Sequence, residues 1–315
     1  MKPLVSIIIV TYNQVAYLEQ AIRSSQQQTY NNIEIIGVDD HSTDGTNELW
    51  LQLSAKYPGI TYLPRSAHQG YCKTFNRGFA QAKGKYIIDL SGDDVLLPQR
   101  VAIGVDCLEK AQEDFGVHFS DAHYIDQKGQ LISGHFKRDG NGALKRAVPE
   151  GDIYQDLLER YFVCAPTMMI KKQVLDILGG YDENLYYEDF DFWIRSSRNY
   201  KYIFSDQVLV QKRVVSNSMA KGQYLPGSSM MQSTYRVCEK ALGLNRSDND
   251  HKALAKRIGY ELRQCIILNE YTVANRYLAL INQLPSVPWY YQLVKKLVAL
   301  KWNWTFLGRM IRPAK

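Results

Sequence analysis

The chain lacks the cysteine pattern of a zinc site or of a disulfide framework. Its five cysteines are odd in number and widely scattered, and they form no C-x-x-C pair. Structural zinc sites and small disulfide-linked folds depend on closely spaced or evenly paired cysteines. The sequence therefore argues against both kinds of site and favours a reducing compartment.

Long apolar runs are also missing. No run of about 18 apolar residues occurs, so no membrane-spanning helix is expected. The apolar run 4–10 is too short for a secretory core, and polar residues follow it at once. With 45% hydrophobic and 22% charged residues in 315 positions, we expect a folded globular protein. Its length allows one large domain with an appendage or two modest domains.

Acidic residues are absent from the segment 286–315, which contains six of the 38 Lys and Arg residues. The other 32 basic residues (38 − 6) balance the 32 acidic ones, so the net charge of +6 belongs to this tail. A basic surface spread over the whole chain is therefore not predicted, and we do not expect a nucleic-acid partner.

Apolar, β-branched segments alternate with helical patterns in the first part of the chain. Strands are predicted at residues 5–10, 33–38, 60–63 and 86–90. This alternation predicts an α/β fold with a parallel sheet covered by helices on both faces. The alternation weakens after Asp94, and the chain is predicted to be helical from about Met230 onward.

Polar clusters follow three of these predicted strands. They are Thr11-Tyr12-Asn13, Asp39-Asp40 and Ser91-Gly92-Asp93-Asp94. Ligands bind beyond the carboxyl ends of the strands in such sheets, so we expect the three clusters to meet at one rim. Asp39 and Asp40 could serve only as turn residues. Their place in a parallel sheet favours a role in accepting hydrogen bonds from a nucleotide base or ribose.

Asp93 and Asp94 place two carboxylates side by side directly after a strand. Adjacent carboxylates repel each other, and a divalent cation with oxygen ligands would compensate them. Mg²⁺ typically uses one or two carboxylates together with substrate phosphates. The pair therefore favours a nucleotide diphosphate held through a metal, and the alternative is a surface turn.

A third acidic cluster lies in the aromatic segment YYEDFDFWIR, residues 186–195. It contains Glu188, Asp189 and Asp191. Acids also favour the positive end of a helix dipole, which would explain their position but not the surrounding aromatic residues. A carboxylate in such surroundings is a candidate general base for a hydroxyl group.

In this order, four segments resemble the inverting family 2 glycosyltransferases. They are VSIIIVTYNQVAYLEQAIRS, IEIIGVDDHSTDGT, HQGYCKTFNRGFAQAKGKYIIDLSGDD and GGYDENLYYEDFDFWIR. The resemblance covers roughly residues 4–220. It implies the GT-A fold, which is Rossmann-like with a mostly parallel sheet flanked by helices, here with a C-terminal helical extension. We expect a catalytic domain at 1–225 and a helical region at 226–315.

The resemblance also implies roles for individual residues. Asp189 would be the general base with Glu188 beside it, and Asp93 would ligate Mg²⁺ or Mn²⁺. Residues implied to bind the nucleotide sugar are Thr11, Tyr12, Asn13, Asp39, Asp40, Ser91, Gly92, Asp94, Arg195 and Arg213. The chain departs from the family pattern at Ser91, where the metal motif usually has Asp, at Phe75, where Arg is frequent, and near Val215, where His often follows the Arg.

The implied activity is the transfer of a sugar, of the hexosyltransferase class, with inversion. The donor would be a UDP- or dTDP-linked sugar, and the acceptor would be a hydroxyl of a glycan or a lipid-linked molecule in cell-surface polysaccharide biosynthesis. A catalytically weakened binding or scaffold protein is the alternative, and Ser91 favours it. A nucleotidyltransferase would need a Gly- and Lys-rich loop that the segment TYNQVAYLEQ lacks.

The basic tail carries an apolar stripe at helical spacing: Leu293, Leu297, Leu300, Trp304, Leu307 and Ile311. A cationic amphipathic helix with aromatic residues suits an anionic membrane surface. The same spacing also suits packing on the catalytic domain or on a second subunit. We therefore expect a cytoplasmic protein that is peripheral on the inner face of the cell membrane, and an oligomer is possible.

Overall fold

The computed structural model of the chain describes residues 2–215, 222–287 and 291–301. The chain divides into two compact units. The first combines residues 1–153, 162–184 and 199–216, and the second combines residues 154–161, 185–198 and 217–315. The second unit thus takes residues 154–161 and 185–198, and begins its third segment at 217, within the range 1–225 that was predicted to be the catalytic domain.

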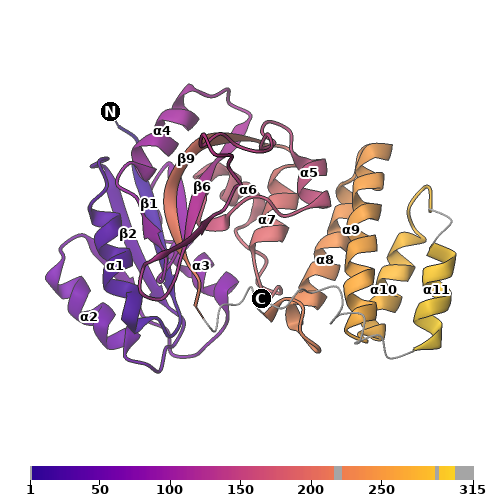
Figure 1. Cartoon of the computed structure of the whole chain (residues 1–315). Coiled ribbons are helices and arrows are strands. Elements are labelled where there is room, and N and C mark those ends of the chain that lie inside the picture. The colour runs from indigo at the N-terminus through magenta and orange to yellow at the C-terminus, as the bar shows by residue number, and fades with distance from the viewer. Residues whose placement is uncertain (1, 216–221, 288–290, 302–315) are drawn as a thin grey trace. The chain divides into compact units, whose positions relative to one another are not determined.

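A nine-stranded mixed sheet forms the centre of the first unit, in the order β3-β2-β1-β4-β8-β6-β9-β5, with β7 paired to β6 (Figure 1). The strands are β1 (Val5–Thr11), β2 (Ile33–Asp39), β3 (Ile60–Leu63), β4 (Tyr86–Ser91), β5 (Val95–Leu96), β6 (Phe115–Ile125), β7 (Leu131–Gly134), β8 (Met169–Lys171) and β9 (Lys201–Arg213). The four strands β1 to β4 are parallel, as predicted. The rest of the sheet is mixed: β6 and β9 are parallel, whereas β5, β7 and β8 run antiparallel to their neighbours. The α/β fold class is therefore confirmed, with the parallel part confined to β1–β4 and the β6–β9 pair.

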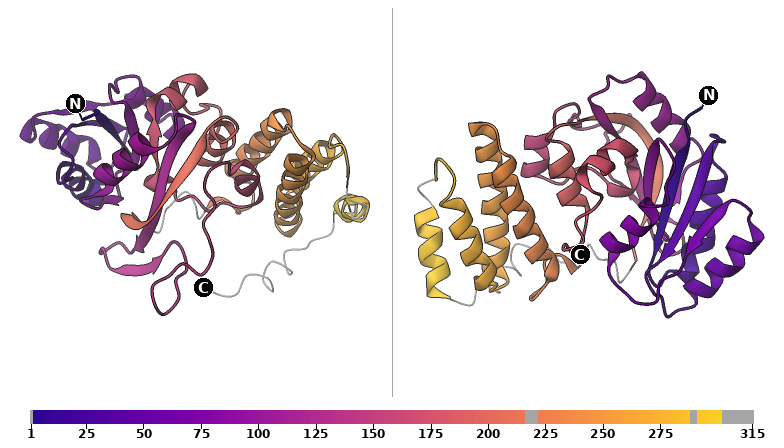
Figure 2. Two further views of the ribbon diagram at one scale, coloured as in Figure 1. Left: turned by 90° about the horizontal axis from the view of Figure 1, so that it is seen from above. Right: turned by 180° about the vertical axis from the view of Figure 1, so that it is seen from behind.

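Helices cover both faces of the parallel part of the sheet (Figures 1 and 2). The helices of the first unit are α1 (Val15–Gln26), α2 (Thr46–Lys56), α3 (Tyr71–Phe79), α4 (Arg100–Lys110) and α6 (Lys172–Leu178), with a short 3₁₀ turn at Ala165–Thr167. Alternate residues of β1 point to opposite faces. Ile7 and Ile9 belong to the core shared with α1, α2 and α4, whereas Ile8 faces Gly78 of α3.

The strand register brings the carboxyl ends of three strands to one level. Thr11 of β1 is paired with Asp39 of β2, and Val10 of β1 is paired with Ser91 of β4. The polar clusters that follow these strands therefore begin at the same rim of the sheet, as predicted.

A buried tryptophan on α2 packs against the sheet at a glycine. Trp50 is completely buried, and its ring fills the space above Gly37 of β2. A Cβ atom added to Gly37 would lie 2.4 Å from the Trp50 ring. The indole N–H donates to the hydroxyl of Thr11 at 3.0 Å. Gly37 therefore permits the close approach that positions α2 against the end of β1.

The second unit is helical. Its helices are α5 (Tyr154–Glu159), α7 (Asp189–Ser196), α8 (Ser229–Leu244), α9 (Asp248–Ile267), α10 (Tyr271–Ile281) and α11 (Tyr291–Leu300), and α8 to α11 lie side by side (Figures 1 and 2). Serine caps begin two of them: the side chain of Ser228 accepts from Met230 N, and that of Ser247 accepts from Asp250 N. The predicted helical character is confirmed for the described residues of this region.

Three contacts attach the start of α7 to α8. The backbone N–H of Tyr186 donates to Ser233 Oγ at 2.8 Å, and the hydroxyl of Tyr187 lies 2.7 Å from that of Thr234. The third contact is an ion pair of 2.6 Å between Lys240 and the buried carboxylate of Asp191. These contacts explain why the segment 185–198 belongs with the C-terminal helices.

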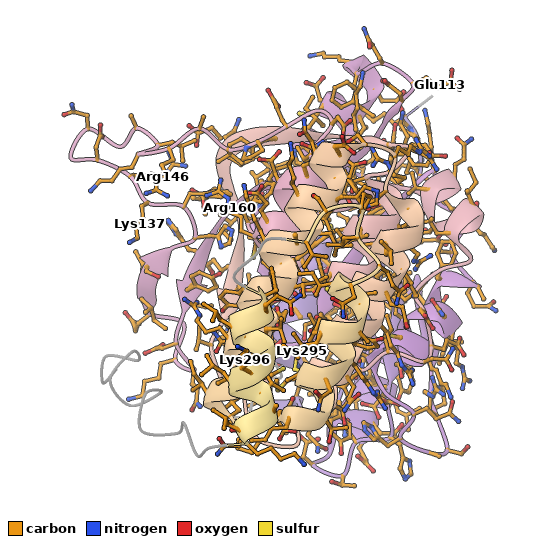
Figure 3. The ribbon with its side chains drawn as sticks, turned by 90° about the vertical axis from the view of Figure 1, so that its right-hand side faces the viewer. Glu113, Lys137, Arg146, Arg160, Lys295 and Lys296 are labelled. Carbon is orange, nitrogen blue, oxygen red and sulfur yellow. The ribbon has the colours of Figure 1, made fainter. Side chains whose placement is uncertain are left out.

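Helix α11 packs through one face and exposes the other. Tyr291 and Val298 are buried, whereas Leu293, Leu297 and Leu300 are exposed. Figure 3 shows Lys295 and Lys296 on this helix. The rest of the predicted apolar stripe, at positions 304, 307 and 311, lies outside the described residues. Within the described part of the chain, no helix has the length and hydropathy to cross a bilayer.

We predict that Gly37→Ala destabilises the first unit, because the added methyl group would clash with the buried Trp50 ring. The expected loss in the free energy of unfolding is about 1–3 kcal/mol, as for overpacked cores, measured by urea denaturation. Gly140→Ala is the matched control, since nothing lies within 4 Å of its Cβ position. A loss for Gly37→Ala no larger than for the control would contradict the tight packing.

We predict that Lys240→Met also destabilises the protein, because Asp191 is 1% exposed and would retain only Arg195 of its two cationic partners. The expected loss is about 2 kcal/mol, less than for a fully buried pair because Lys240 is partly exposed. Lys256→Met is the control, since its ion pair with Glu159 is exposed and should contribute less than about 1 kcal/mol. Equal losses in the two variants would show that the Asp191 contact does not stabilise the fold.

Candidate active site

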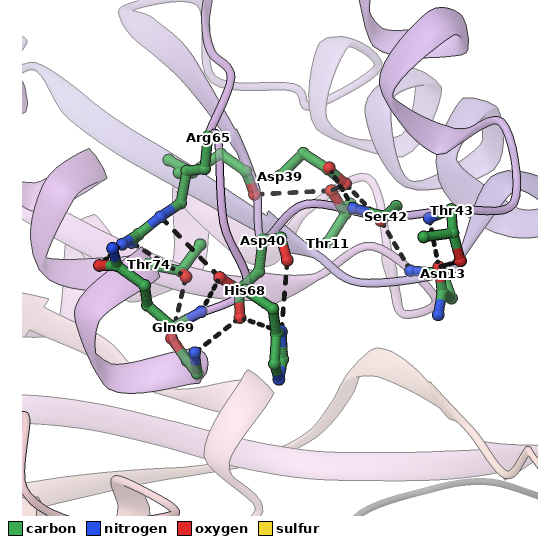
Figure 4. A network of polar contacts seen from close by, with 12 residues as sticks. Thr11, Asn13, Asp39, Asp40, Ser42, Thr43, Arg65, His68, Gln69 and Thr74 are labelled. Atoms are coloured by element: carbon green, nitrogen blue, oxygen red, sulfur yellow. Dashed lines mark hydrogen bonds and ion pairs between the residues drawn. The ribbon is translucent and has the colours of Figure 1, made fainter.

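The hydroxyl of Thr11 joins the ends of β1 and β2. It is fully buried and donates to Asp39 Oδ1 at 2.8 Å while it accepts from the Trp50 indole. Asp39 also accepts two hydrogen bonds from Ser42, from the backbone N–H at 2.8 Å and from the hydroxyl at 2.6 Å (Figure 4). Asp39 therefore organises the turn after β2, and its carboxylate accepts hydrogen bonds from the end of β1 and from this turn.

Asn13 connects the loop after β1 to the loop after β2. Its backbone N–H donates to Ser42 Oγ, and its side-chain oxygen accepts from the N–H of Thr43, both at 2.8 Å. Asn13 has a φ of 53°, in the left-handed region that Asn adopts more readily than most residues. The backbone conformation and the side chain of Asn13 thus hold the two rim loops together.

Asp40 holds a different loop. Its carboxylate accepts from the backbone N–H groups of Gln69 and Gly70 at 2.9 and 2.8 Å, and it pairs with His68 Nδ1 at 2.9 Å (Figure 4). The guanidinium of Arg65 lies 3.8 Å away. Asp40 is buried, so it fixes the loop that leads into α3 and leaves the imidazole of His68 at the surface.

An exposed aromatic pair lies beside these carboxylates. The rings of Tyr12 and His68 are stacked, with centroids 4.3 Å apart. Tyr12 is 47% exposed, and the side chain of His68 is 53% exposed. Flat rings at a solvent-exposed rim provide a surface on which a planar base can stack.

The segment after β4 buries two adjacent carboxylates. Asp93 accepts from Ser91 Oγ at 2.6 Å, and Ser91 accepts in turn from Gln14 Nε2 at 3.0 Å. Burial raises the pKa of Asp93 above its usual range. Burial and the nearby charge of Asp93 raise the pKa of Asp94 to about 8. Burial thus disfavours the ionised form of both carboxylates, and a nearby cation would favour it.

Gly92 lies between Ser91 and these carboxylates where the chain passes close to the end of β1. A Cβ at this position would lie 2.4 Å from Thr11 Cγ2 and 2.9 Å from Gln14 Oε1. Thr11 is itself held by Asp39 and Trp50. Glycine is therefore required here for a close approach between the two rim segments.

Arg213, at the end of β9, is buried in contacts with its own chain. Its backbone N–H donates to Asp94 Oδ1 at 2.8 Å. Its guanidinium donates to the carbonyls of Asp93 and Asp126 at 3.0 and 2.8 Å and to Gln20 Oε1 at 2.7 Å. Arg213 therefore lies next to the acidic pair and holds this loop in place, and its predicted contact with the nucleotide sugar stays a prediction.

The oxygen atoms around Asp93 fit a hard divalent cation. Besides the carboxylate and the Ser91 hydroxyl, Gln14 contributes a buried Oε1 atom that has no hydrogen-bond partner. The described residues contain no group of three or more His, Cys, Asp or Glu side chains that could hold a metal. An ion at this position would therefore need ligands from a bound substrate, as Mg²⁺ commonly takes from phosphates.

Three residues near this rim were not identified from the sequence. Asp89 of β4 accepts from the hydroxyl of Tyr71 at 2.7 Å and from that of Tyr181 at 2.9 Å. Asp89 lies two residues before Ser91, so both side chains point to the same face of the strand. The two-residue spacing of Asp89 and Ser91 in the sequence could therefore have indicated that Asp89 lies on the same face of the sheet as Ser91.

The second unit contains the third acidic cluster. Glu188 is the N-cap position of α7, and Asp189 is its first residue, with Asp189 Oδ1 accepting from Phe190 N at 2.7 Å. Asp191 is buried and paired with Arg195 at 2.6 Å. The structure thus separates the three acids: Asp191 is a structural carboxylate within α7, whereas Glu188 and Asp189 lie at the start of the helix.

Curated relatives of this chain are glycosyltransferases. It is 33% identical to an uncharacterized glycosyltransferase of Rickettsia prowazekii over 68% of this chain and 64% of that protein. It is 30% identical to an uncharacterized glycosyltransferase of Methanocaldococcus jannaschii over 68% of this chain and 71% of that protein. The chain thus spans less than two thirds of the length of the Rickettsia relative.

Solved structures share the fold. TarS residues 1–349 of S. aureus, in complex with UDP, superpose with a TM-score of 0.68 at 15% identity, covering 95% of this chain and 88% of that one. The mannosyltransferase PcManGT of Pyrobaculum calidifontis, in complex with GDP-Man and Mn²⁺, gives 0.62 at 17% identity, covering 98% and 84%. The family model for glycosyl transferase family 2 matches residues 6–176. The chain therefore belongs to glycosyl transferase family 2 and has the GT-A fold.

Proposed function

We propose that this enzyme transfers a sugar, with inversion, from a nucleoside diphosphate sugar to an acceptor hydroxyl. The observation that carries the proposal is the pair of adjacent buried carboxylates after β4, whose pKa values are raised mainly by burial. A diphosphate bound together with a divalent ion supplies both the charge and the missing ligands. Fold neighbours solved with UDP-GlcNAc and with GDP-Man and Mn²⁺ support this choice of donor class.

Asp93 would hold the ion, with the Ser91 hydroxyl orienting its carboxylate. When bound, Mg²⁺ or Mn²⁺ would neutralise the charge of the diphosphate leaving group. Tyr12 and His68 would stack on the base, and the loops organised by Asp39 and Asp40 would surround the base and ribose. The donor base is proposed to be uracil or thymine, as the family resemblance implies.

Asp189 is proposed to be the general base. It would take the proton of the acceptor hydroxyl as that oxygen forms a bond to the anomeric carbon. The bond from the anomeric carbon to the diphosphate oxygen breaks in the same step, so a single displacement inverts the configuration. Glu188 is proposed to act beside Asp189, while Arg195 keeps α7 rigid through Asp191.

The acceptor is proposed to be a hydroxyl of a glycan or of a lipid-linked molecule in cell-surface polysaccharide biosynthesis. This proposal is supported by the basic helix α11, whose exposed leucines suit an enzyme that works beside a membrane. The enzyme would then be cytoplasmic and peripheral on the inner face of the cell membrane. The alternative, a binding or scaffold protein, is favoured only by Ser91 in place of the usual aspartate.

We predict that one nucleotide raises the melting temperature of the protein and that Mn²⁺ or Mg²⁺ increases the effect. UDP, dTDP, GDP and CMP are titrated with and without metal in a thermal-shift assay. A ligand at 100 times its Kd should stabilise the fold by about 2.7 kcal/mol. Asp93→Ala should remove the metal-dependent part, whereas Asp106→Ala, at an exposed carboxylate paired with Lys110, should retain it. The absence of stabilisation by any nucleotide would favour the scaffold alternative.

We predict that Asp189→Asn retains nucleotide stabilisation but lowers sugar transfer by about 10²- to 10⁴-fold, because the amide cannot accept the proton. Transfer is measured as nucleotide released from the stabilising donor, with a lipid and glycan extract as the acceptor. Asp248→Asn is the matched control, because Asp248 is also an acid in the first turn of a helix in the same unit. Equal activity of Asp189→Asn and wild type would exclude Asp189 as the base.

A further inference from the structure

Helix α11 gathers exposed leucines on one side. Leu293, Leu297 and Leu300 are 53%, 38% and 65% exposed. They make up three of the eleven exposed large apolar side chains in the described residues, although the helix has only ten residues. The other eight lie singly or in pairs along the rest of the chain. Scattered apolar residues are normal on a protein surface, whereas a cluster on one helix indicates a binding surface.

The leucines point away from the face that α11 uses for packing. Tyr291 and Val298 are buried, and the hydroxyl of Tyr291 donates to the carbonyl of Ala255 on α9 at 2.8 Å. At about 100° of rotation per residue, the three leucines span about 60° on the side opposite Tyr291 and Val298. The packing of α11 therefore leaves its leucine face exposed. These leucines do not pack on another part of the described chain, as one alternative for the apolar stripe had predicted.

The charges beside this face have one sign. Lys296 lies about 40° from Leu300 on the helix, and Lys301 follows the helix. Lys295 lies on the opposite side, about 40° from Tyr291. The segment 286–315 contains six basic residues and no acidic one. A second copy packed face to face would bring these lysines together without any carboxylate from the same segment. An anionic lipid surface supplies both the negative charge and an apolar layer for the leucines, while lysine side chains can extend to the phosphates.

We propose that the leucine face of α11, flanked by Lys296 and Lys301, is a docking surface for an anionic lipid bilayer. Leu293, Leu297 and Leu300 insert at the level of the headgroups, and the lysines contact lipid phosphates. The helix lies in the plane of the interface and does not span the bilayer. This inference concerns the place where the enzyme works, and it does not depend on the identity of the donor sugar.

The test is flotation of the purified full-length protein with vesicles. One set consists of phosphatidylcholine alone, and the other contains phosphatidylcholine mixed with phosphatidylglycerol. We expect binding to the anionic set that decreases as salt is added. Lys296→Gln combined with Lys301→Gln should weaken that binding about 10- to 30-fold. The triple variant Leu293→Ser, Leu297→Ser, Leu300→Ser should weaken it by at least about 10-fold.

Matched controls separate this face from general surface effects. Leu51→Ser, Leu131→Ser and Ile177→Ser together remove three other exposed apolar side chains, and Lys137→Gln with Lys252→Gln removes two other exposed lysines. Both control variants should bind vesicles like the wild type. All five positions of the α11 variants are exposed, so the variants should fold, and the nucleotide thermal shift provides an independent check of the first unit.

Other outcomes would overturn the proposal. Equal binding to neutral and anionic vesicles would contradict the role of the lysines. A control variant that loses as much binding as the α11 variants would place the surface elsewhere. A solution molar mass of a dimer in the wild type and of a monomer in the leucine variant, without vesicle binding, would make the face a contact between two copies. Failure of nucleotide binding in all variants, with vesicle binding intact, would contradict only the proposed reaction.

Discussion

Two adjacent buried carboxylates impose the main constraint on the first unit. Asp93 and Asp94 are held at the end of β4, where burial raises the pKa of both and the charge of Asp93 raises that of Asp94 further. The surrounding residues hold the two carboxylates in place, yet the nearby charges of Lys212 and Arg213 do not bring their pKa values back to the usual range. Ser91 orients one carboxylate, and the backbone N–H of Arg213 donates to the other, while Gly92 allows close contact with β1. A divalent cation, proposed to bind here with a diphosphate, would supply the positive charge that favours the ionised form of both carboxylates.

The sequence predicted this rim because its signals are local. Continuous β-branched runs indicate buried parallel strands, and polar residues directly after them must lie at the carboxyl ends. The partners of those residues could not be predicted. Asp40 bonds to backbone N–H groups of residues 69 and 70, and Arg213 reaches Gln20 across the fold. Such contacts depend on the paths of distant loops, so the sequence predicted which residues lie at the rim but not the protein groups to which they bond.

The division of the chain shows the same limit at a larger scale. Residues 185–198 lie between segments of the first unit in sequence, so an uninterrupted catalytic domain was the simplest prediction. In the structure, the hydroxyl of Tyr187 hydrogen-bonds to Thr234 of α8, and Asp191 forms an ion pair with Lys240 of α8. Removing one partner of a buried ion pair leaves an uncompensated charge, so the pair of Asp191 and Lys240 holds α7 on α8. The candidate base Asp189 is consequently carried by a helix that the C-terminal helices hold, which gives those helices a part in the proposed reaction.

Ser91 was the strongest argument for a protein that has lost catalysis, and its contacts weaken that argument. Its hydroxyl donates to Asp93 and accepts from Gln14. An aspartate at this position would add a third carboxylate to two that already have raised pKa values, and it could not donate to Asp93 unless it were protonated. Serine therefore lowers the electrostatic cost of the motif and orients the carboxylate proposed to hold the metal. Both hydrogen bonds of Ser91 hold the segment that contains Asp93, the residue proposed to bind the metal. Serine at this position is therefore compatible with the proposed reaction.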